Sequence, residues 1–269
     1  SAQETFVSDL YWEQMQYLGD TYIQALTYLY LTGDETLYRV ALAHFDDSRA
    51  PFGLTQSRYP SDPAQYCPIF SLLWIEMIHD FWMLSPDLEF VSQFAPGIHA
   101  VLGWFLPRIN DRNLLELQPY LDFTDWKFHE HRRPEIAALD DKSSTLHRLC
   151  LVTALDKAAS LLRAFGEDAF ADRYRSMADQ VRRAVASQCF RPDRGLFSDS
   201  PVADLFSQPT NVQAVIAGAA PDGNEQAVID RLLSEPDLIP IELYFRFYFA
   251  RALVKAGLAE RYVSQLEPW

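Results

Sequence analysis

Apolar residues recur at helical spacing along almost the whole chain. In residues 148–166 they form one stripe, and the charged Lys157 and Arg163 lie off it. This stripe consists of Leu151, Leu155, Ala158, Leu162 and Phe165. Its i, i+4, i+7 spacing predicts a helix lying on a core. A second stripe follows in residues 168–189. It consists of Phe170, Tyr174, Met177, Val181 and Val185. Gly166 between them suits the left-handed position that ends a helix, so the two segments are predicted to form a helical hairpin.

The same pattern is repeated elsewhere. Gly33 is predicted to end one helix and Asp34 to cap the next, and Gly257 plays the part of Gly33 near the end of the chain. Further helices are predicted at 68–84, 87–107, 208–219, 224–234 and 241–256. The count is about ten helices in five hairpins, with short extended segments only around 114–117 and 195–198. The fold class is therefore all-α.

The connections between the hairpins differ in length. Short glycine turns alternate with long polar loops at 49–66, 110–142 and 190–208. Long loops in a compact domain are usually functional. Helices arranged in a ring, with the long loops gathered at one working face, would explain the alternation. A regular solenoid is not favoured, because no fixed period of ~34–45 residues is found.

Composition narrows the possible partners. The 269 residues carry a formal net charge of −14, which disfavours nucleic acid and anionic membranes. Solubility alone is a sufficient reason for such acidity. Three widely spaced cysteines without a CxxC pair favour free thiols over disulfides or a zinc site. No apolar run reaches the ~18 residues of a membrane span, and no secretory signal is present. A processed start would remove such a signal, so a cytoplasmic or a periplasmic location stays open.

The stretch YWEQMQYLGDTYIQ places two carboxylates among aromatic rings. If Glu13 and Asp20 lay on one continuous helix, they would share a face about 10 Å apart. Trp12 and the neighbouring tyrosines could then stack on the CH faces of a sugar whose hydroxyls the carboxylates bind. The alternative is structural: Tyr11, Trp12 and Tyr17 are core aromatics, and Glu13 is solvated.

Two further candidates lie in the long central loop. In DFTDW, Asp125 next to Trp126 again couples an acid to a stacking ring, although the pattern alone is weak. In FHEH, the alternation of His129, Glu130 and His131 lacks the spacing of a helical metal site and favours a solvated loop. No metal site or cofactor is therefore predicted. The remaining histidines, taken as structural, are His44, His79, His99 and His147.

Several motifs occur together in a familiar order. They are EQMQYLGD, GLTQSRYPSDPAQY, SLLWIEMIHDFW, FTDW and YFRFYFARALVKAG. In order and spacing they resemble the catalytic domain of bacterial α-L-rhamnosidases, and the likeness runs from about residue 8 to the end. The resemblance implies an (α/α)6-barrel of six hairpins and an inverting glycoside hydrolase whose partner is a carbohydrate, an α-L-rhamnoside.

The resemblance also assigns roles. It implies that Glu13 is the general acid and that Asp20 binds sugar hydroxyls. Asp125 and Trp126 correspond to an acid and a tryptophan of the family's Gly-Asp-Trp-like segment, and Asp9 to a further sugar-binding acid. Aromatic packing by Trp12 or Tyr17 is expected to raise the pKa of Glu13, whereas Asp20 and Asp125 are expected to stay ionised.

Some positions depart from the family's pattern. Leu10 stands where a proline is common, and Tyr22 where an arginine is common, so a changed subsite or another α-L-linked sugar is an alternative. A second alternative is a non-catalytic helical scaffold that binds a protein or peptide, which the repeated hairpins support.

In the family the general base is a glutamate in a loop, and the resemblance places this loop after Trp269. Residues 1–269 are thus expected to be one catalytic-domain fragment of a longer multi-domain enzyme, nearly inactive alone. Glu242 could replace the base, but a helix-start acid is the simpler interpretation. Missing hairpins would expose the apolar face of YFRFYFARAL and permit self-association.

Overall fold

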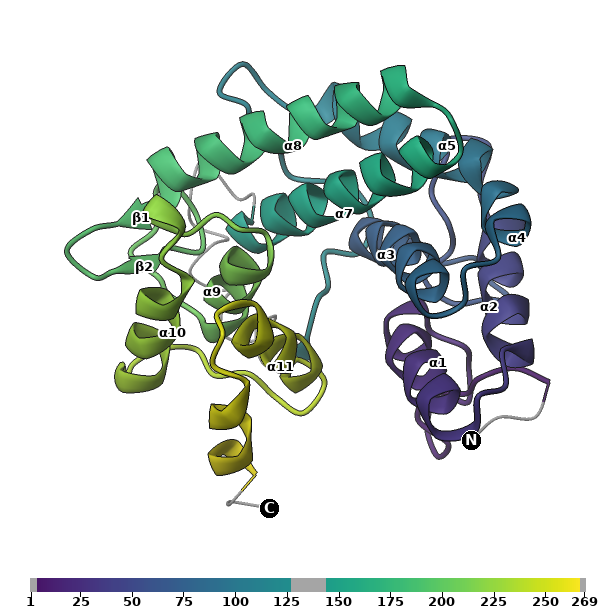
Figure 1. Ribbon diagram of the computed structural model, residues 1–269, viewed down its shortest axis with the longest axis horizontal. Helices are drawn as coiled ribbons and strands as arrows, with labels where there is room; N and C mark the ends of the chain where they lie inside the picture. Colours follow the sequence, from purple (N-terminus) through teal and green to yellow (C-terminus); the bar gives the residue numbers. More distant parts are fainter. Residues whose placement is uncertain (1–3, 127–143, 267–269) are drawn as a thin grey trace. The chain divides into compact units, whose positions relative to one another are not determined.

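The computed structural model describes residues 4–126 and 144–266, which form a mostly helical chain (Figure 1). The α-helices in these ranges are α1 (Leu18–Thr32), α2 (Thr36–Asp47), α3 (Pro68–Leu84), α4 (Leu88–Ser92), α5 (Ala95–Phe105), α7 (Thr145–Ala164), α8 (Asp168–Cys189), α9 (Gln208–Ile216), α10 (Glu225–Ser234) and α11 (Arg246–Lys255). Short 3-10 helices lie at Leu106–Arg108, Pro221–Gly223 and Ala259–Gln265. The all-α prediction is confirmed.

The glycine turns end the helices as predicted. Gly33 after α1 and Gly166 between α7 and α8 have φ values of 70° and 84°, a left-handed conformation that costs glycine little. The Asp34 carboxylate accepts a hydrogen bond from the Thr36 backbone N–H (2.9 Å) at the start of α2. The predicted helix at 87–107 is instead divided into α4 and α5. Pro96 is the reason, because it has no N–H to donate and its ring would clash with the carbonyl four residues earlier.

The predicted extended segments are also present. Strand β1 (Phe190–Arg191) pairs antiparallel with β2 (Leu196–Phe197) and forms a small hairpin in the 190–208 loop. Leu115 forms an isolated bridge with Ile109. These are the β-pairings nearest the two segments that the sequence marked as extended.

The chain divides into two compact units. The first comprises residues up to 108, 118–122 and 154–177, and the second comprises 109–117, 123–153 and 178 onward. In the second unit, α9 packs with α10 and α11. The rings of Phe245, Tyr248 and Phe249 are buried there. The apolar face expected to be exposed on YFRFYFARAL is therefore covered, and that expectation was wrong.

In the first unit, the core forms around α3. This helix is apolar nearly all round, and its Trp74 is fully buried, donating its indole N–H to the Leu42 carbonyl (3.1 Å). Gly97 on α5 lies against this ring: a Cβ there would approach Trp74 to 2.5 Å. Contacts of α3 with α1, α2 and α5 complete the unit's packing.

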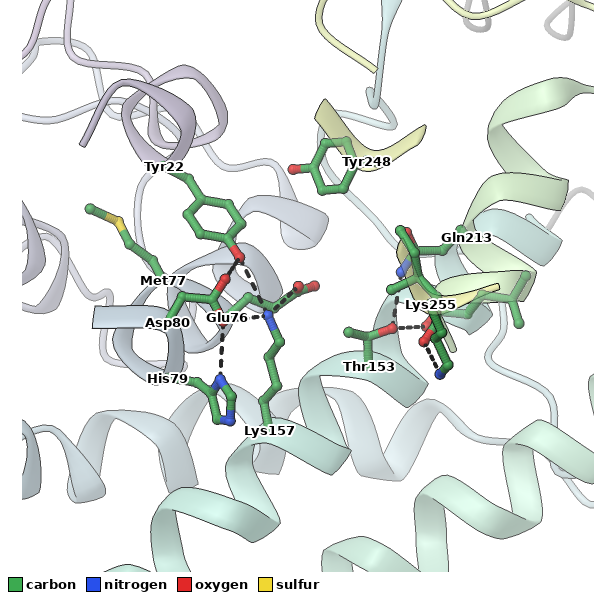
Figure 2. Close-up of polar contacts among 12 residues, drawn as sticks. Tyr22, Glu76, Met77, His79, Asp80, Thr153, Lys157, Gln213, Tyr248 and Lys255 are labelled. Atoms are coloured by element: carbon green, nitrogen blue, oxygen red, sulfur yellow. Dashed lines mark hydrogen bonds and ion pairs between the residues drawn. The ribbon is translucent and has the colours of Figure 1, made fainter. Parts of the chain in front are cut away.

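A buried charge cluster connects three helices of this unit (Figure 2). The Lys157 ammonium of α7 donates to Asp80 (2.9 Å) and Glu76 (3.1 Å), both on α3. It also lies 3.3 Å from the Tyr22 hydroxyl of α1, which itself donates to Asp80 (2.5 Å). His79 Nδ1 is 3.0 Å from the same carboxylate. Paired charges of this kind avoid the large cost of burying an isolated ion.

We expect Lys157→Met to lower the free energy of unfolding by about 3–5 kcal/mol, because it leaves two buried carboxylates without their cation. Urea denaturation measures the loss. Arg163→Met, on the exposed side of the same helix, is the matched control and is expected to cost at most about 1 kcal/mol. Equal losses in the two variants would contradict the importance of the cluster.

Candidate active site

Glu13 lies on a closed turn and not on a helix. The turn is closed by a hydrogen bond from the Ser8 N–H to the Met15 carbonyl (2.8 Å) and one from the Gln14 N–H to the Asp9 carbonyl (3.0 Å). Helix α1 begins only at Leu18, so the continuous helix considered for Glu13 and Asp20 does not exist. Asp20 occupies the first turn of α1, where the helix dipole favours a carboxylate.

A second segment holds this turn in place. The Leu18 N–H donates to the Ser57 carbonyl (2.9 Å), and the Tyr59 N–H donates to the Gln16 carbonyl (3.1 Å). Tyr17 and Arg58 form an antiparallel bridge. This long-range pairing competes with helix formation at 11–17 and explains why the apolar spacing there does not produce a helix.

The turn and α1 bring Asp9, Glu13 and Asp20 into electrostatic contact. Partial burial raises the pKa of Glu13, the negative charges of Asp20 and Asp9 raise it further, and the Arg58 guanidinium opposes them. Burial also raises the pKa of Asp20, against hydrogen bonds from the backbone and from the Ser8 hydroxyl. The rise expected for Glu13 is found, but its neighbours differ from expectation: Trp12 is 80% exposed, so its packing is not the cause.

Arg58 is the residue of this cluster that the sequence did not single out. Its guanidinium donates to the Tyr17 hydroxyl (3.0 Å) and lies 5.7 Å from the centre of the Tyr17 ring. Tyr17 is half-buried, whereas Tyr11 and Trp12 are exposed, so these two are not the core aromatics of the structural alternative. The signal available in the sequence was an arginine inside a long polar loop.

Asp125 and Trp126 belong to the second unit. Asp125 is only 5% exposed and accepts a hydrogen bond from the Trp126 N–H (2.8 Å), while the Trp126 ring is 61% exposed and packs edge-on against Phe123. Burial raises the pKa of Asp125 to about 6, and the nearby Glu242 carboxylate raises it as well. Asp125 is thus still mainly ionised at pH 7, but less readily than expected.

Glu242 is not the first-turn charge of a helix. Helix α11 begins at Arg246, and the Glu242 backbone N–H donates to the Asp125 carboxylate. His129, Glu130 and His131 lie outside the described residues. Within residues 4–126 and 144–266, no group of three or more potential metal ligands is found, and no helix is long and apolar enough to cross a bilayer.

Helical hairpins with carboxyl groups clustered at a turn and at the start of α1 occur in proteins of several classes, and comparison with known proteins identifies the family. Residues 8–236 match the bacterial alpha-L-rhamnosidase 6 hairpin glycosidase domain, and the chain belongs to this family. The recognition of the family and of a glycosidase is confirmed. No curated protein matches the sequence.

Solved structures show the same fold. A rhamnosidase from Klebsiella oxytoca with rhamnose bound has a TM-score of 0.86 at 20% identity, over 99% of this chain and 51% of its own. A GH78 family rhamnosidase of Bacillus sp. GL1 has a TM-score of 0.85 at 24% identity, and the match covers 99% of this chain and 28% of that protein. An α-L-rhamnosidase from Dictyoglumus thermophilum has a TM-score of 0.68 at 16% identity, and the match covers 92% of this chain and 28% of that protein. The chain spans about half the length of the first of these proteins and less of the others.

The clustered charges predict opposite effects on the pKa of Glu13. Asp20→Asn removes a negative neighbour and is expected to lower this pKa, whereas Arg58→Met removes a positive one and is expected to raise it. Carboxyl-carbon NMR titration of the chain measures both. Shifts of the same sign in the two variants would contradict the geometry.

The raised pKa of Asp125 leads us to predict that the stability of the protein depends on pH. Because its folded-state pKa is raised, ionisation costs folding free energy as the pH rises from about 4 to above 6. The difference between 3.8 and about 6 corresponds to about 3 kcal/mol at 1.36 kcal/mol per pH unit. Asp125→Asn cannot ionise and is expected to gain up to this amount relative to the wild type between pH 4 and pH 7, as urea denaturation would show. A pH-independent difference between the two proteins would disprove the assignment.

Proposed function

We propose that the protein is an inverting glycoside hydrolase that removes terminal α-L-rhamnose from glycosides or polysaccharides. The observation that carries the proposal is the clustering of Glu13, Asp9 and Asp20 in a domain of the rhamnosidase family, where burial and the two neighbouring carboxyl groups raise the pKa of Glu13. The rhamnose bound to the Klebsiella oxytoca protein of the same fold supports this sugar. The domain, residues 1–269, is proposed to be one catalytic-domain part of a longer enzyme.

In this mechanism Glu13 is the general acid. A raised pKa favours the protonated form that a general acid needs, and Glu13 gives its proton to the glycosidic oxygen as the bond from this oxygen to the anomeric carbon breaks. The sugar then carries positive charge, which the side chains of Asp20 and Asp9 are proposed to stabilise. For Asp125 and Trp126 of the second unit, sugar binding is proposed on the family resemblance alone.

Inversion requires a second carboxylate roughly 6.5–9.5 Å from the acid, which takes a proton from the attacking water. We propose that this general base comes from outside the 269 residues, as the family resemblance implies. Glu242 is engaged through its backbone with Asp125 and is not proposed for the role.

The alternatives gain little support from the described residues. Tyr22 stands where arginine is common in the family. It is fully buried and contacts Asp80 and Lys157, so this difference in sequence affects the charge cluster and not an exposed sugar subsite. A peptide-binding scaffold gives no reason for three acids to lie beside one strained turn.

We expect Glu13→Gln to reduce the hydrolysis of methyl α-L-rhamnoside by the whole enzyme about 10²–10⁴-fold, because proton donation is lost. The loss should be much smaller for 4-nitrophenyl α-L-rhamnoside, whose leaving group needs little protonation. Rhamnose-dependent thermal stabilisation of the 269-residue chain should persist in the variant. Equal losses on the two substrates would exclude Glu13 as the acid, and no stabilisation by rhamnose among a panel of sugars would favour the scaffold.

A further inference from the structure

The tip of the Glu13 turn exposes large apolar side chains to water. Leu10, Tyr11 and Trp12 are 58%, 77% and 80% exposed, whereas Trp74 and Trp104 of the same unit are 0% and 6% exposed. Two rings next to a candidate catalytic acid are thus accessible in a unit that buries Trp74 and Trp104 and leaves Trp82 partly exposed.

Hydrogen bonds hold the backbone that carries the rings. The Asp9 carboxylate accepts hydrogen bonds from the Tyr11 N–H (3.2 Å) and the Trp12 N–H (3.0 Å), and the Gln14 side-chain amide donates to the Leu10 carbonyl (3.1 Å). Asp9 and Gln14 both have positive φ values, 40° and 52°, which non-glycine residues adopt only at a cost. Tyr11 and Trp12 pack edge to face with ring centres 4.7 Å apart. A strained turn with a hydrogen-bonded backbone that presents two solvated rings is typical of a binding surface and not of a core.

The position of the acid indicates what these rings bind. A general acid donates to the oxygen between the sugar and its leaving group, so it lies at the border of the two subsites. Trp12 directly precedes Glu13, with Cα atoms about 3.8 Å apart. Polar groups, Asp20 and Arg58, lie near the same acid and suit sugar hydroxyls. The exposed rings suit a less polar partner.

We propose that Tyr11 and Trp12 form the subsite for the leaving group and favour rhamnosides whose leaving group carries a flat ring. The inference rests on the proposed function and goes beyond it, since it assigns Trp12 to the leaving group instead of to rhamnose. The ring can be aromatic or the CH face of a second sugar, because both stack on tryptophan and tyrosine.

The test measures dissociation constants by calorimetry on the 269-residue chain. The probes are L-rhamnose, methyl α-L-rhamnoside, 4-nitrophenyl 1-thio-α-L-rhamnoside, which resists hydrolysis, and a rhamnosyl-glucose disaccharide. A ring-bearing probe is expected to bind about tenfold more tightly than methyl α-L-rhamnoside. The aryl and disaccharide probes show which ring is preferred.

Trp12→Ala is expected to abolish the tenfold preference and to leave the affinity for L-rhamnose unchanged, and Trp12→Phe to retain much of it. Tyr30→Ala is the matched control, because Tyr30 is 72% exposed near the far end of α1 and should alter neither affinity.

Three results would overturn the inference. Rhamnose binding without a preference for either ring-bearing probe would show that another part of the protein, and not a leaving group, covers the rings. Equal weakening of all probes by Trp12→Ala would place the ring in the rhamnose subsite. If no probe binds, the proposed function itself fails, and the inference fails with it.

Discussion

The ion pairs of the partly buried Lys157 ammonium with two buried carboxylates are the interaction on which the first unit depends most. The ammonium joins α7 to α3 through Asp80 and Glu76, and it reaches α1 through the Tyr22 hydroxyl. Because leaving the two buried carboxylates without their cation would be costly, the cluster favours the observed arrangement of these three helices. Apolar burial alone would tolerate sliding between helices.

This fixed arrangement reaches the candidate acid through a short path. Tyr22 lies in the same helix as Asp20, two residues further on, so anchoring the one restrains the other. The turn that carries Glu13 is then attached to the start of α1 and to residues 57–59. The electrostatic contact between Glu13 and Asp20 is therefore set by an ion cluster, a helix and a pair of backbone hydrogen bonds. Each of these is stiffer than a surface loop.

Local patterns in the sequence predicted the helices well and the site less well. The stripes of α7 and α8 and the glycine turns are local signals, and the structure confirms them. Glu13 was considered as a helical residue because the strand-like pairing of the nearby Tyr17 is with Arg58, 41 positions away, and leaves no periodic signal. The contact of Glu242 with Asp125 is likewise long-range. Of these differences between prediction and structure, the division of the helix at Pro96 is the one that local chemistry could have predicted.

A turn suits a general acid better than the helix first considered. On a helix, residues 12 and 13 would point about 100° apart, and one of them would face the core. In the observed turn, Asp9 satisfies the backbone N–H groups of Tyr11 and Trp12, so both rings and the adjacent acid can lie at an exposed tip without leaving donors unpaired. One oxygen of Asp9 is thereby occupied in holding the turn, so Asp9 positions the turn in addition to the sugar-binding role proposed for it. The strain at Asp9 and Gln14 is then a consequence of placing an acid and its stacking rings side by side.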